Sequence, residues 1–393
     1  MTRRERVKML FLALGGIGDS VLTFATARRL RQVFPKDEIV ALAMWPQSAE
    51  LLKDLGIFDE VLHHQFQRAP LWRSLQLVGQ LSRRRFDISI QAFPANRFEY
   101  NVVHWLIHAR RRVGHEYLRG SSATYLRWLL TDRVAQTKGT HCIDENLKVL
   151  GVFGCRALEG PIDTSLGPLA PEYRAYAERM TLRWSGPLLG VHAGSSTYKN
   201  LHAKRWPPER FAELCRRALD EEGVTPLLFG SALDQEVNGA IQRQCPAARL
   251  VETPSIRHTA AMIQHCKVYV SNDSALAHVA SALAVPTVIV TGPTDAMEVG
   301  PFAEGGCAVV SPLRCAPCFR VSRQPLRCQH PRRFACMKAI DVDTVLGRVR
   351  NVLRQGIGRR AMPGRGENTD DGTGDSLFRV PVRVLASLGV HRG

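Results

Sequence analysis

The sequence predicts an α/β protein built from two doubly wound halves. Its 393 residues suffice for two domains of ordinary size, at roughly 100 to 200 residues each. Apolar runs that suit buried strands alternate with helical patterns, and this alternation, which is typical of parallel βαβ units, begins twice along the chain. The hydrophobic content of 45% and the charged content of 23% are near globular averages, which excludes a fibrous or wholly disordered chain.

The first half opens on a continuous apolar run at 7–14, which suits a strand buried on both faces. A glycine turn and a helical pattern follow this run, and the alternation continues to about residue 155. We therefore assign residues 1–165 to an N-terminal domain. Strands are expected at 7–14, 38–44 and 60–64, and helices at 20–34 and 48–56.

The second half follows a linker marked by Pro161, Gly167, Pro168 and Pro171. Residues 186–340 repeat the alternation and are assigned to a C-terminal domain. A closing helix at 341–356 and a disordered tail at 357–393, rich in Gly and polar residues, complete the prediction. Strands are expected at 187–194, 224–231, 267–273 and 286–295, and helices at 171–183, 210–223, 259–266 and 274–284.

The sequence predicts a cytoplasmic protein. No apolar run approaches the roughly 18 residues that a membrane span needs. The apolar residues near the N-terminus lead into Gly15 and Gly16 instead of a cleavage site, so a first core strand explains them better than a signal peptide.

The charge of the chain favours anionic partners. Lys and Arg number 53 against 36 Asp and Glu, which gives a formal net charge of +17. Nucleic acid, phosphorylated metabolites and an anionic membrane surface all fit such an excess. Nucleic acid is the weakest of these interpretations, because no recognised binding motif accompanies the charge and aromatic residues are only 7%.

The turn after the first strand contains Gly15, Gly16 and Gly18 and then Asp19. It matches neither a dinucleotide fingerprint nor a phosphate loop. Asp19 is expected at the carboxyl edge of the sheet, where open α/β folds place their ligands. It would either cap the following helix or act as a general base, and the helix dipole should lower its pKa and weaken it as a base.

Two arginine clusters, Arg83–Arg85 and Arg110–Arg112, lie in the same half. They form either a solvated surface or a site that holds an acidic acceptor near Asp19.

The polar loop after the first strand of the second half holds Ser195 and Ser196, followed by Lys204 and Arg205. Hydroxyl, ammonium and guanidinium groups could together bind a diphosphate. An ordinary basic loop is the competing interpretation.

Another strand of this half ends at Asp273, and a helix follows at once. The free N–H groups at the helix N-terminus, near Ser274, could bind a phosphate, and His278 one turn later could add a donor. Alternatively, Asp273 caps the helix and His278 is a satisfied core histidine.

Four segments together resemble glycosyltransferase family 9, the family of the lipopolysaccharide heptosyltransferases. They are "LGGIGDSVLTFATARRLRQVFP", "HAGSSTYKNLHAKRWPPERFAEL", "VSNDSALAHVASALAVPTVIVTGPTD" and the cysteine-containing "CAPCF…CM", in the family's order over about residues 7 to 352. The resemblance implies a GT-B fold, in which two Rossmann-like domains face a cleft, the first binding the acceptor and the second the nucleotide sugar.

The resemblance also implies roles for single residues. Asp19 matches the catalytic base, and Lys204 the lysine on the donor diphosphate. Ala275 departs from the family, which usually has Gly there, so the diphosphate site could be narrower or the donor different. The implied donor-site residues are Ser195, Ser196, Lys204, Gly230, Ser231, Asp273, Ser274 and His278, with Gly15, Gly16 and Gly18 in the loop between acceptor and donor.

The implied activity is inverting, metal-independent transfer of a sugar, heptose from ADP-heptose, to a lipopolysaccharide core or related glycolipid. The implied partners are a nucleotide-sugar donor and an anionic glycolipid, with peripheral contact at the inner face of the cytoplasmic membrane. Residues 311–360 hold 12 basic and 2 acidic side chains, which suits a membrane-facing patch. A GT-B transferase using a UDP- or GDP-sugar, a nucleic-acid-binding protein and an inactive scaffold remain alternatives.

Four of the ten cysteines are clustered, namely Cys315, Cys318, Cys328 and Cys336. The first pair has the spacing of a zinc knuckle and the second does not. A structural Zn or Fe site and a loop of packed thiols are both open, and neither has a catalytic role.

Overall fold

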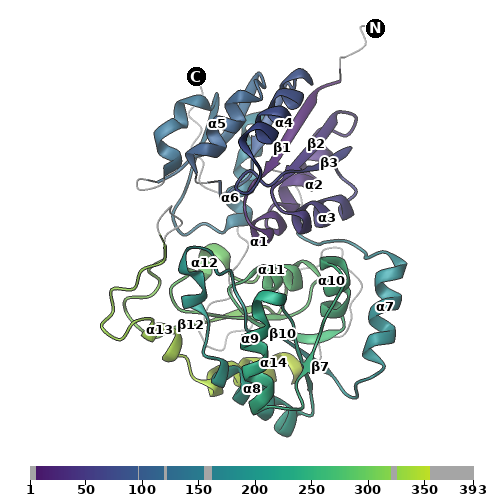
Figure 1. Ribbon diagram of the computed structural model, residues 1–393, viewed down its shortest axis with the longest axis vertical. Coiled ribbons are helices and arrows are strands. Elements are labelled where there is room, and N and C mark those ends of the chain that lie inside the picture. The colour runs from purple at the N-terminus through teal and green to yellow at the C-terminus, as the bar shows by residue number, and fades with distance from the viewer. Residues whose placement is uncertain (1–5, 96, 119–121, 155–161, 320–324, 355–393) are drawn as a thin grey trace, which may run out of the picture.

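The computed structural model describes residues 6–95, 97–118, 122–154, 162–319 and 325–354. Within these residues the chain forms two six-stranded sheets with helices on both faces, one sheet in each half (Figure 1). The predicted disordered tail at 357–393 lies outside the described residues, and the predicted domain boundaries remain predictions.

The first sheet has the strand order β3-β2-β1-β4-β5-β6, and its neighbouring strands are parallel. The order reverses between β1 and β4, because the chain first builds outward to β3 and then returns to the other side of β1. The strands are β1 (Lys8–Ala13), β2 (Glu38–Ala43), β3 (Glu60–His63), β4 (Ile88–Gln91), β5 (Arg111–Glu116) and β6 (Asp132–Ala135). The helices are α1 (Ile17–Val21), α2 (Phe24–Val33), α3 (Pro46–Asp54), α4 (Leu71–Arg83), α5 (Phe98–Leu106) and α6 (Cys142–Lys148), with 3-10 helices η1 (Ser122–Leu129) and η2 (Val149–Phe153).

The second sheet repeats this topology as β12-β11-β10-β7-β8-β9, with its reversal between β7 and β10. The strands are β7 (Leu188–His192), β8 (Thr225–Leu228), β9 (Arg249–Leu250), β10 (Cys266–Asn272), β11 (Thr287–Thr291) and β12 (Cys307–Val310). The helices are α7 (Pro171–Thr181), α8 (Pro208–Glu222), α9 (Gln235–Gln244), α10 (Ile256–Gln264), α11 (Ala275–Ala282), α12 (Ala296–Val299), α13 (Ala335–Lys338) and α14 (Val342–Arg354), with 3-10 helices η4 (Tyr198–Lys204) and η5 (Ala232–Asp234).

Both sheets therefore have the Rossmann strand order, with one reversal point each. In open α/β sheets, ligands bind beyond the carboxyl ends of the strands at such a reversal. Figure 1 shows the halves stacked so that α1 of the first lies next to α11 of the second. The carboxyl edges of the two sheets consequently face one another.

The predicted elements are confirmed with small shifts at their ends, apart from the helix expected at 20–34. This segment forms two helices, α1 and α2, separated by Leu22 and Thr23. Helix α1 begins at Ile17, earlier than predicted, because the N–H of Gly16 donates to the carboxylate of Asp19 and closes the first turn.

A continuous core joins the halves. One cluster of buried side chains runs from Phe24 and Leu30 of α2 to Met262 of α10 and Val279 of α11. The linker is tied to the second half at Leu166, whose N–H donates to the carbonyl of Ala282 at 2.8 Å. Burial of shared apolar surface fixes the two reversal points relative to one another.

The predicted closing helix corresponds to α14, which packs against α8 and against β10, β11 and β12. Its buried side chains belong to the second half's own core. Trp206 connects the residue that precedes this helix by two positions to the end of β10. Its Nε1 donates to the carbonyl of Ile340 at 3.0 Å, and its backbone N–H donates to Asn272 Oδ1 at 2.8 Å. The segment around Lys204 is thereby anchored to the end of β10.

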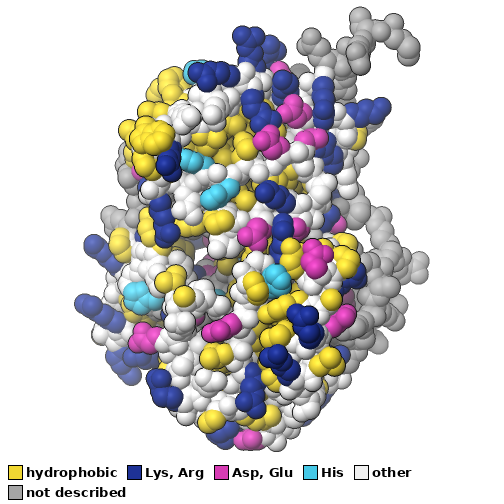
Figure 2. All heavy atoms as spheres, turned by 45° about the vertical axis from the view of Figure 1, so that its right-hand side comes forward, with side chains coloured by type: hydrophobic (Ala, Val, Ile, Leu, Met, Phe, Trp, Pro, Cys, Tyr) yellow, Lys and Arg dark blue, Asp and Glu magenta, His cyan; other side chains and the backbone are white. Residues whose placement is uncertain are grey.

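Basic side chains are spread over both halves on the face drawn in Figure 2, so the positive charge is not confined to residues 311–360. Among the described residues, no helix combines the length and apolar character that a membrane span requires.

Candidate functional site

Asp19 lies at the reversal point of the first sheet, between the carboxyl ends of β1 and β4. Its side chain is half-buried, and its Oδ2 accepts the Gly16 N–H at 2.6 Å. Asp19 therefore closes the first turn of α1, as the capping interpretation proposed, although it does so from the third position of the helix and Gly16 is the N-cap residue. The small pocket beside it is lined by Ala13, Gly15, Ser20, Thr23, Ala92, Phe93 and Pro94.

The pKa of Asp19 is raised above its ordinary value. Burial is the largest cause, and the negative charge of Asp273 adds to it, while the Gly16 N–H and Lys204 act in the opposite direction. The sequence-based expectation of a lowered pKa is wrong, because loss of water outweighs the hydrogen bond from the Gly16 N–H at the start of α1. A raised pKa makes this carboxylate a better proton acceptor than an exposed one.

Gly18 brings the two halves into contact at this point. A Cβ atom at Gly18 would lie 2.8 Å from His278 Cδ2, closer than side chains approach, and a tight 3.2 Å from Ala275 Cα. Glycine is therefore required for α1 to meet the first turn of α11. This approach places Asp19 within electrostatic range of the charged groups that follow β10.

Lys204, Asp273 and His278 form a buried charge cluster at the reversal point of the second sheet. Lys204 Nζ lies 2.5 Å from Asp273 Oδ2, and His278 Nε2 lies 3.9 Å from Asp273 Oδ1. Burial acts to raise the pKa of Asp273, but Lys204 and His278 outweigh it and the pKa is lowered. Asp273 thus stays ionised and holds the Lys204 ammonium near the N-terminus of α11.

Burial lowers the pKa of His278 to about 4, in spite of the nearby Asp273. The ring is therefore neutral near pH 7, with one N–H donor and one acceptor. Its Nδ1 is buried without a hydrogen-bond partner within the described residues, so the interpretation as a satisfied core histidine is wrong.

Ser274 precedes α11 and faces a second polar network under the same edge. Its Oγ lies 2.9 Å from His192 Nδ1 and 2.9 Å from Ser271 Oγ. The free N–H groups of α11 begin directly after it, as the phosphate-site prediction requires.

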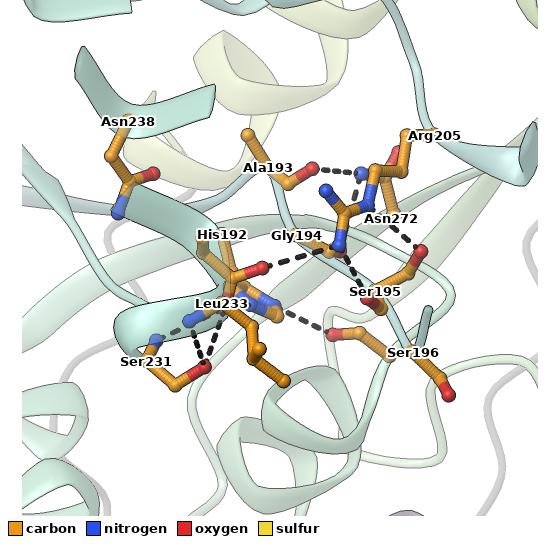
Figure 3. Close-up of polar contacts among 12 residues, drawn as sticks. His192, Ala193, Gly194, Ser195, Ser196, Arg205, Ser231, Leu233, Asn238 and Asn272 are labelled. Atoms are coloured by element: carbon orange, nitrogen blue, oxygen red, sulfur yellow. Dashed lines mark hydrogen bonds and ion pairs between the residues drawn. The ribbon is translucent and has the colours of Figure 1, made fainter. Parts of the chain in front are cut away.

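The loop after β7 places Ser195 and Ser196 differently. Ser195 is buried: its Oγ donates to the carbonyl of Leu201, and Arg205 donates to its backbone oxygen at 2.5 Å (Figure 3). Ser196 is exposed, and its Oγ accepts the Tyr198 N–H at 3.2 Å. Ser195 shapes the loop, whereas Ser196 is free to meet a ligand.

Gly230 and Ser231 surround the carboxylate of Asp234 after β8. A Cβ at Gly230 would lie 2.8 Å from Asp234 Cβ, and the Ser231 N–H and Oγ both donate to Asp234 Oδ2. Burial opposes ionisation of Asp234, but His192, the Ser231 N–H and Arg205 lower its pKa to about 2. The predicted nucleoside position is thus lined by polar groups, among them Ser231 and Asn238 (Figure 3).

His192 and Asp234 were not predicted as site residues from the sequence. His192 Nε2 lies 3.7 Å from Asp234 Oδ2, and His192 Nδ1 also contacts Ser274. These two residues therefore connect the hydrogen bonds of Ser274 to those of Ser231. His192 ends a predicted buried strand, which was an available signal. Nothing in the sequence around Asp234 distinguished it from a surface carboxylate.

The arginine clusters do not approach Asp19. Arg84 pairs with Glu38 and Glu60, and Arg111 pairs with Asp132, all at the amino ends of their strands. Asp19 follows the carboxyl end of β1, so the clusters lie at the opposite edge of the sheet. The hypothesis that they hold an acceptor near Asp19 is wrong.

The clustered cysteines lie near one another. Burial raises the pKa of Cys336, and the neighbouring Cys318, Cys328 and Cys315 raise it further. Cys328 Sγ also accepts the Phe334 N–H at 3.2 Å. In the described part of the chain, however, no three His, Cys, Asp or Glu side chains are arranged as ligands of one metal ion.

Comparison with known proteins gives a consistent result. The model of glycosyltransferase family 9 (heptosyltransferase) matches residues 74–327. Lipooligosaccharide heptosyltransferase 2 of Haemophilus ducreyi is 25% identical over 323 residues, which cover 76% of this chain and 87% of that protein.

Two solved structures illustrate the shared fold. ADP-heptose lps heptosyltransferase II of E. coli superimposes with a TM-score of 0.67 at 22% identity, covering 90% of this chain and 100% of that one. The iron-containing dodecameric glycosyltransferase TibC of enterotoxigenic E. coli H10407 superimposes with a TM-score of 0.54 at 14% identity, covering 90% and 78%. The predicted GT-B fold is confirmed.

The buried His278 predicts a pH-dependent stability. Its pKa is about 4 in the folded protein against 6.5 for the free side chain, so the unfolded chain binds the proton more readily. The free energy of unfolding that the neutral His278 ring allows is therefore fully present above pH 6.5 and is lost as the pH falls toward 4. Between these limits the wild type should lose up to about 3 kcal/mol of unfolding free energy relative to His278→Gln.

Denaturant unfolding at several pH values measures this difference, with His63→Gln, a change at an exposed histidine of β3, as the control. A gap between wild type and His278→Gln that does not change with pH would contradict the assignment of a buried neutral ring.

Proposed function

Because the chain belongs to glycosyltransferase family 9, it is a glycosyltransferase, and we propose that it transfers heptose from ADP-heptose to a lipopolysaccharide core or a related glycolipid. The H. ducreyi relative is a lipooligosaccharide heptosyltransferase, and the E. coli structure is that of an ADP-heptose heptosyltransferase. The observation that carries the proposal is the approach of Asp19 to the Lys204–Asp273–His278 cluster across the facing edges. We place this reaction in the cytoplasm, at the inner face of the membrane that carries the acceptor.

Asp19 is the proposed general base. An acceptor hydroxyl near its carboxylate would lose a proton to it while the hydroxyl oxygen attacks the anomeric carbon of the donor. The bond to the diphosphate breaks on the opposite side, so the configuration inverts in a single displacement. The raised pKa of Asp19 brings the base closer to the pH at which the enzyme works.

The second half supplies the groups that bind the leaving diphosphate. Lys204 provides a cation that Asp273 holds in place, α11 presents backbone N–H groups, and the neutral His278 offers a ring donor. Preorganised donors of this kind stabilise the developing charge without reorganisation. The reaction therefore needs no catalytic metal, since these residues fulfil the role that a cation would have.

Ala275 is the observation that favours a second donor. It replaces the glycine usual in the family, and its backbone lies against Gly18 at the contact between the halves. A methyl group at this position either narrows the diphosphate site or marks a different donor, such as a UDP- or GDP-sugar.

Asp19→Asn should reduce transfer by about 10²- to 10⁴-fold while leaving binding of ADP intact, because the amide cannot accept the proton. The acid limb of the wild-type pH–rate profile should also lie above the ordinary pKa of 3.8, since the pKa of Asp19 is raised. Asp343→Asn, at an exposed carboxylate of α14, is the matched control. Near-normal transfer by folded Asp19→Asn would exclude the base role.

Thermal unfolding with ADP, UDP and GDP tests the donor site, because a ligand that binds the folded state raises the melting temperature. ADP should stabilise the wild type most. Lys204→Ala should weaken ADP binding by about ten- to a hundredfold, since a charge-assisted contact is lost, whereas Lys267→Ala at an exposed lysine of β10 should not. Preference for UDP or GDP would refute ADP-heptose as the donor and support the alternative that Ala275 suggests.

We also propose that the four clustered cysteines hold a structural zinc or iron ion. Four thiols within electrostatic range of one another are a suitable ligand set, and an N–H bond to sulfur, as Phe334 makes to Cys328, stabilises a thiolate. TibC, which shares the fold, is iron-containing. The described thiols would have to draw together around the ion.

Metal analysis of the purified protein should find about one ion per chain, and Cys315→Ser should lose most of it because one of four ligands is removed. Cys307→Ser, at a cysteine outside the cluster, is the control. Equal, near-zero metal in all three proteins would reject the site.

A further inference from the structure

The first turns of α4 expose a group of large apolar side chains. Leu71, Trp72 and Leu75 are 74%, 60% and 53% exposed. At about 100° per residue, these three occupy one arc of the helix, next to the buried stripe of Ser74, Val78 and Leu81. We call Leu71, Trp72 and Leu75, with Arg68 and Arg73, the α4 surface.

The α4 surface lies at the same edge of the first sheet as Asp19. Helix α4 starts after the loop that leaves the carboxyl end of β3, and it runs back toward the amino end of β4. Because the strands are parallel, the carboxyl ends of β1 and β3 share an edge. The exposed apolar side chains at the start of α4 are therefore at the same edge of the sheet as Asp19.

The charge of this segment is uniformly positive. Residues 61–82 contain Arg68 and Arg73 and no Asp or Glu. The guanidinium of Arg73 lies 5.1 Å from the ring centroid of Trp72, and that of Arg68 lies 5.6 Å from the ring of Trp45. Arginine beside an exposed tryptophan matches an interface that is anionic outside and apolar beneath.

We propose that the α4 surface docks this protein on a bilayer that contains anionic phospholipid, with Trp72, Leu71 and Leu75 entering the interfacial region and Arg68 and Arg73 meeting the phosphates. Tryptophan prefers this depth, and arginine near the membrane surface adds electrostatic attraction. The inference rests on the proposed function in one respect: a glycolipid acceptor then arrives from the same surface, at the edge that carries Asp19.

The basic segment at 311–360, which the sequence suggested for this role, lacks the apolar component. None of its described residues is among the large apolar side chains with high exposure. Charge alone gives weak, strongly salt-sensitive attachment, whereas apolar insertion persists as salt rises. A second copy of this chain is a less suitable occupant, because the exposed Arg68 and Arg73 of each copy would repel one another.

Vesicle co-sedimentation tests the proposal directly. The full-length wild type should bind vesicles of phosphatidylethanolamine and phosphatidylglycerol, and only weakly vesicles of phosphatidylcholine. The double variant Trp72→Ala/Leu75→Ala should bind the anionic vesicles about tenfold or more weakly, because two interfacial side chains are removed. Both positions are exposed, so its thermal unfolding should match the wild type.

Trp128→Ala is the matched control, since Trp128 is 68% exposed but precedes β6 at the opposite edge of the first sheet. It should bind vesicles like the wild type, and Arg332→Ala/Arg333→Ala should reduce binding less than Arg68→Ala/Arg73→Ala. Equal binding by Trp72→Ala/Leu75→Ala and wild type would overturn the proposal. So would conversion of an oligomer to a monomer by this variant, seen by light scattering, which would assign the surface to a second copy.

Transfer to a deacylated, water-soluble acceptor separates this inference from the proposed function. Trp72→Ala/Leu75→Ala should retain that activity, whereas Asp19→Asn should lose it. Absence of heptosyl transfer by the wild type would refute the function and leave the vesicle result standing, while normal transfer together with unchanged vesicle binding by the double variant would refute the docking surface alone.

Discussion

The contact of Gly18 with the first turn of α11 is the constraint on which the site depends. Two sheets of the same topology each have a reversal point where a ligand can bind, but the carboxylate of Asp19 belongs to one and the Lys204–Asp273–His278 cluster to the other. The absence of a side chain at Gly18 lets the backbone of α1 reach His278 and Ala275. The shared core from α2 to α11 then holds this approach in place.

Close approach also sets the electrostatics. Asp19 and Asp273 repel one another across the contact, and that repulsion is tolerated because Lys204 and the hydrogen bond from Gly16 offset it. Asp273 remains ionised through its pair with Lys204, whereas burial keeps His278 neutral. One carboxylate with a raised pKa and one fixed cation therefore result from the same burial, acting on groups with different partners.

The position of the α4 surface follows from the direction of the strands in the first sheet. In a parallel sheet every loop that leaves the carboxyl end of a strand lies at the same edge. The turn with Asp19 and the loop into α4 therefore lie at one edge of the sheet, although some 50 residues separate them along the chain. The arginines at 83–85 and 110–112 lie at the other edge for the same reason, and they pair with local carboxylates. Strand direction thus decides which basic residues can serve the acceptor side.

The sequence by itself determined the two α/β halves, most helix and strand positions, and the segments that carry Asp19, Lys204 and Asp273, because hydrophobic periodicity and local motifs are encoded by near neighbours along the chain. Only the tertiary structure decided the sign of the pKa shift of Asp19 and the link of His192 to Asp234. It also decided that, within the described residues, the buried Nδ1 of His278 has no hydrogen-bond partner. These depend on burial and on groups brought together from distant segments. Spacing along the chain carries no information about desolvation, and for this reason the helix dipole of α1 was a poor guide to the charge of the carboxylate it holds.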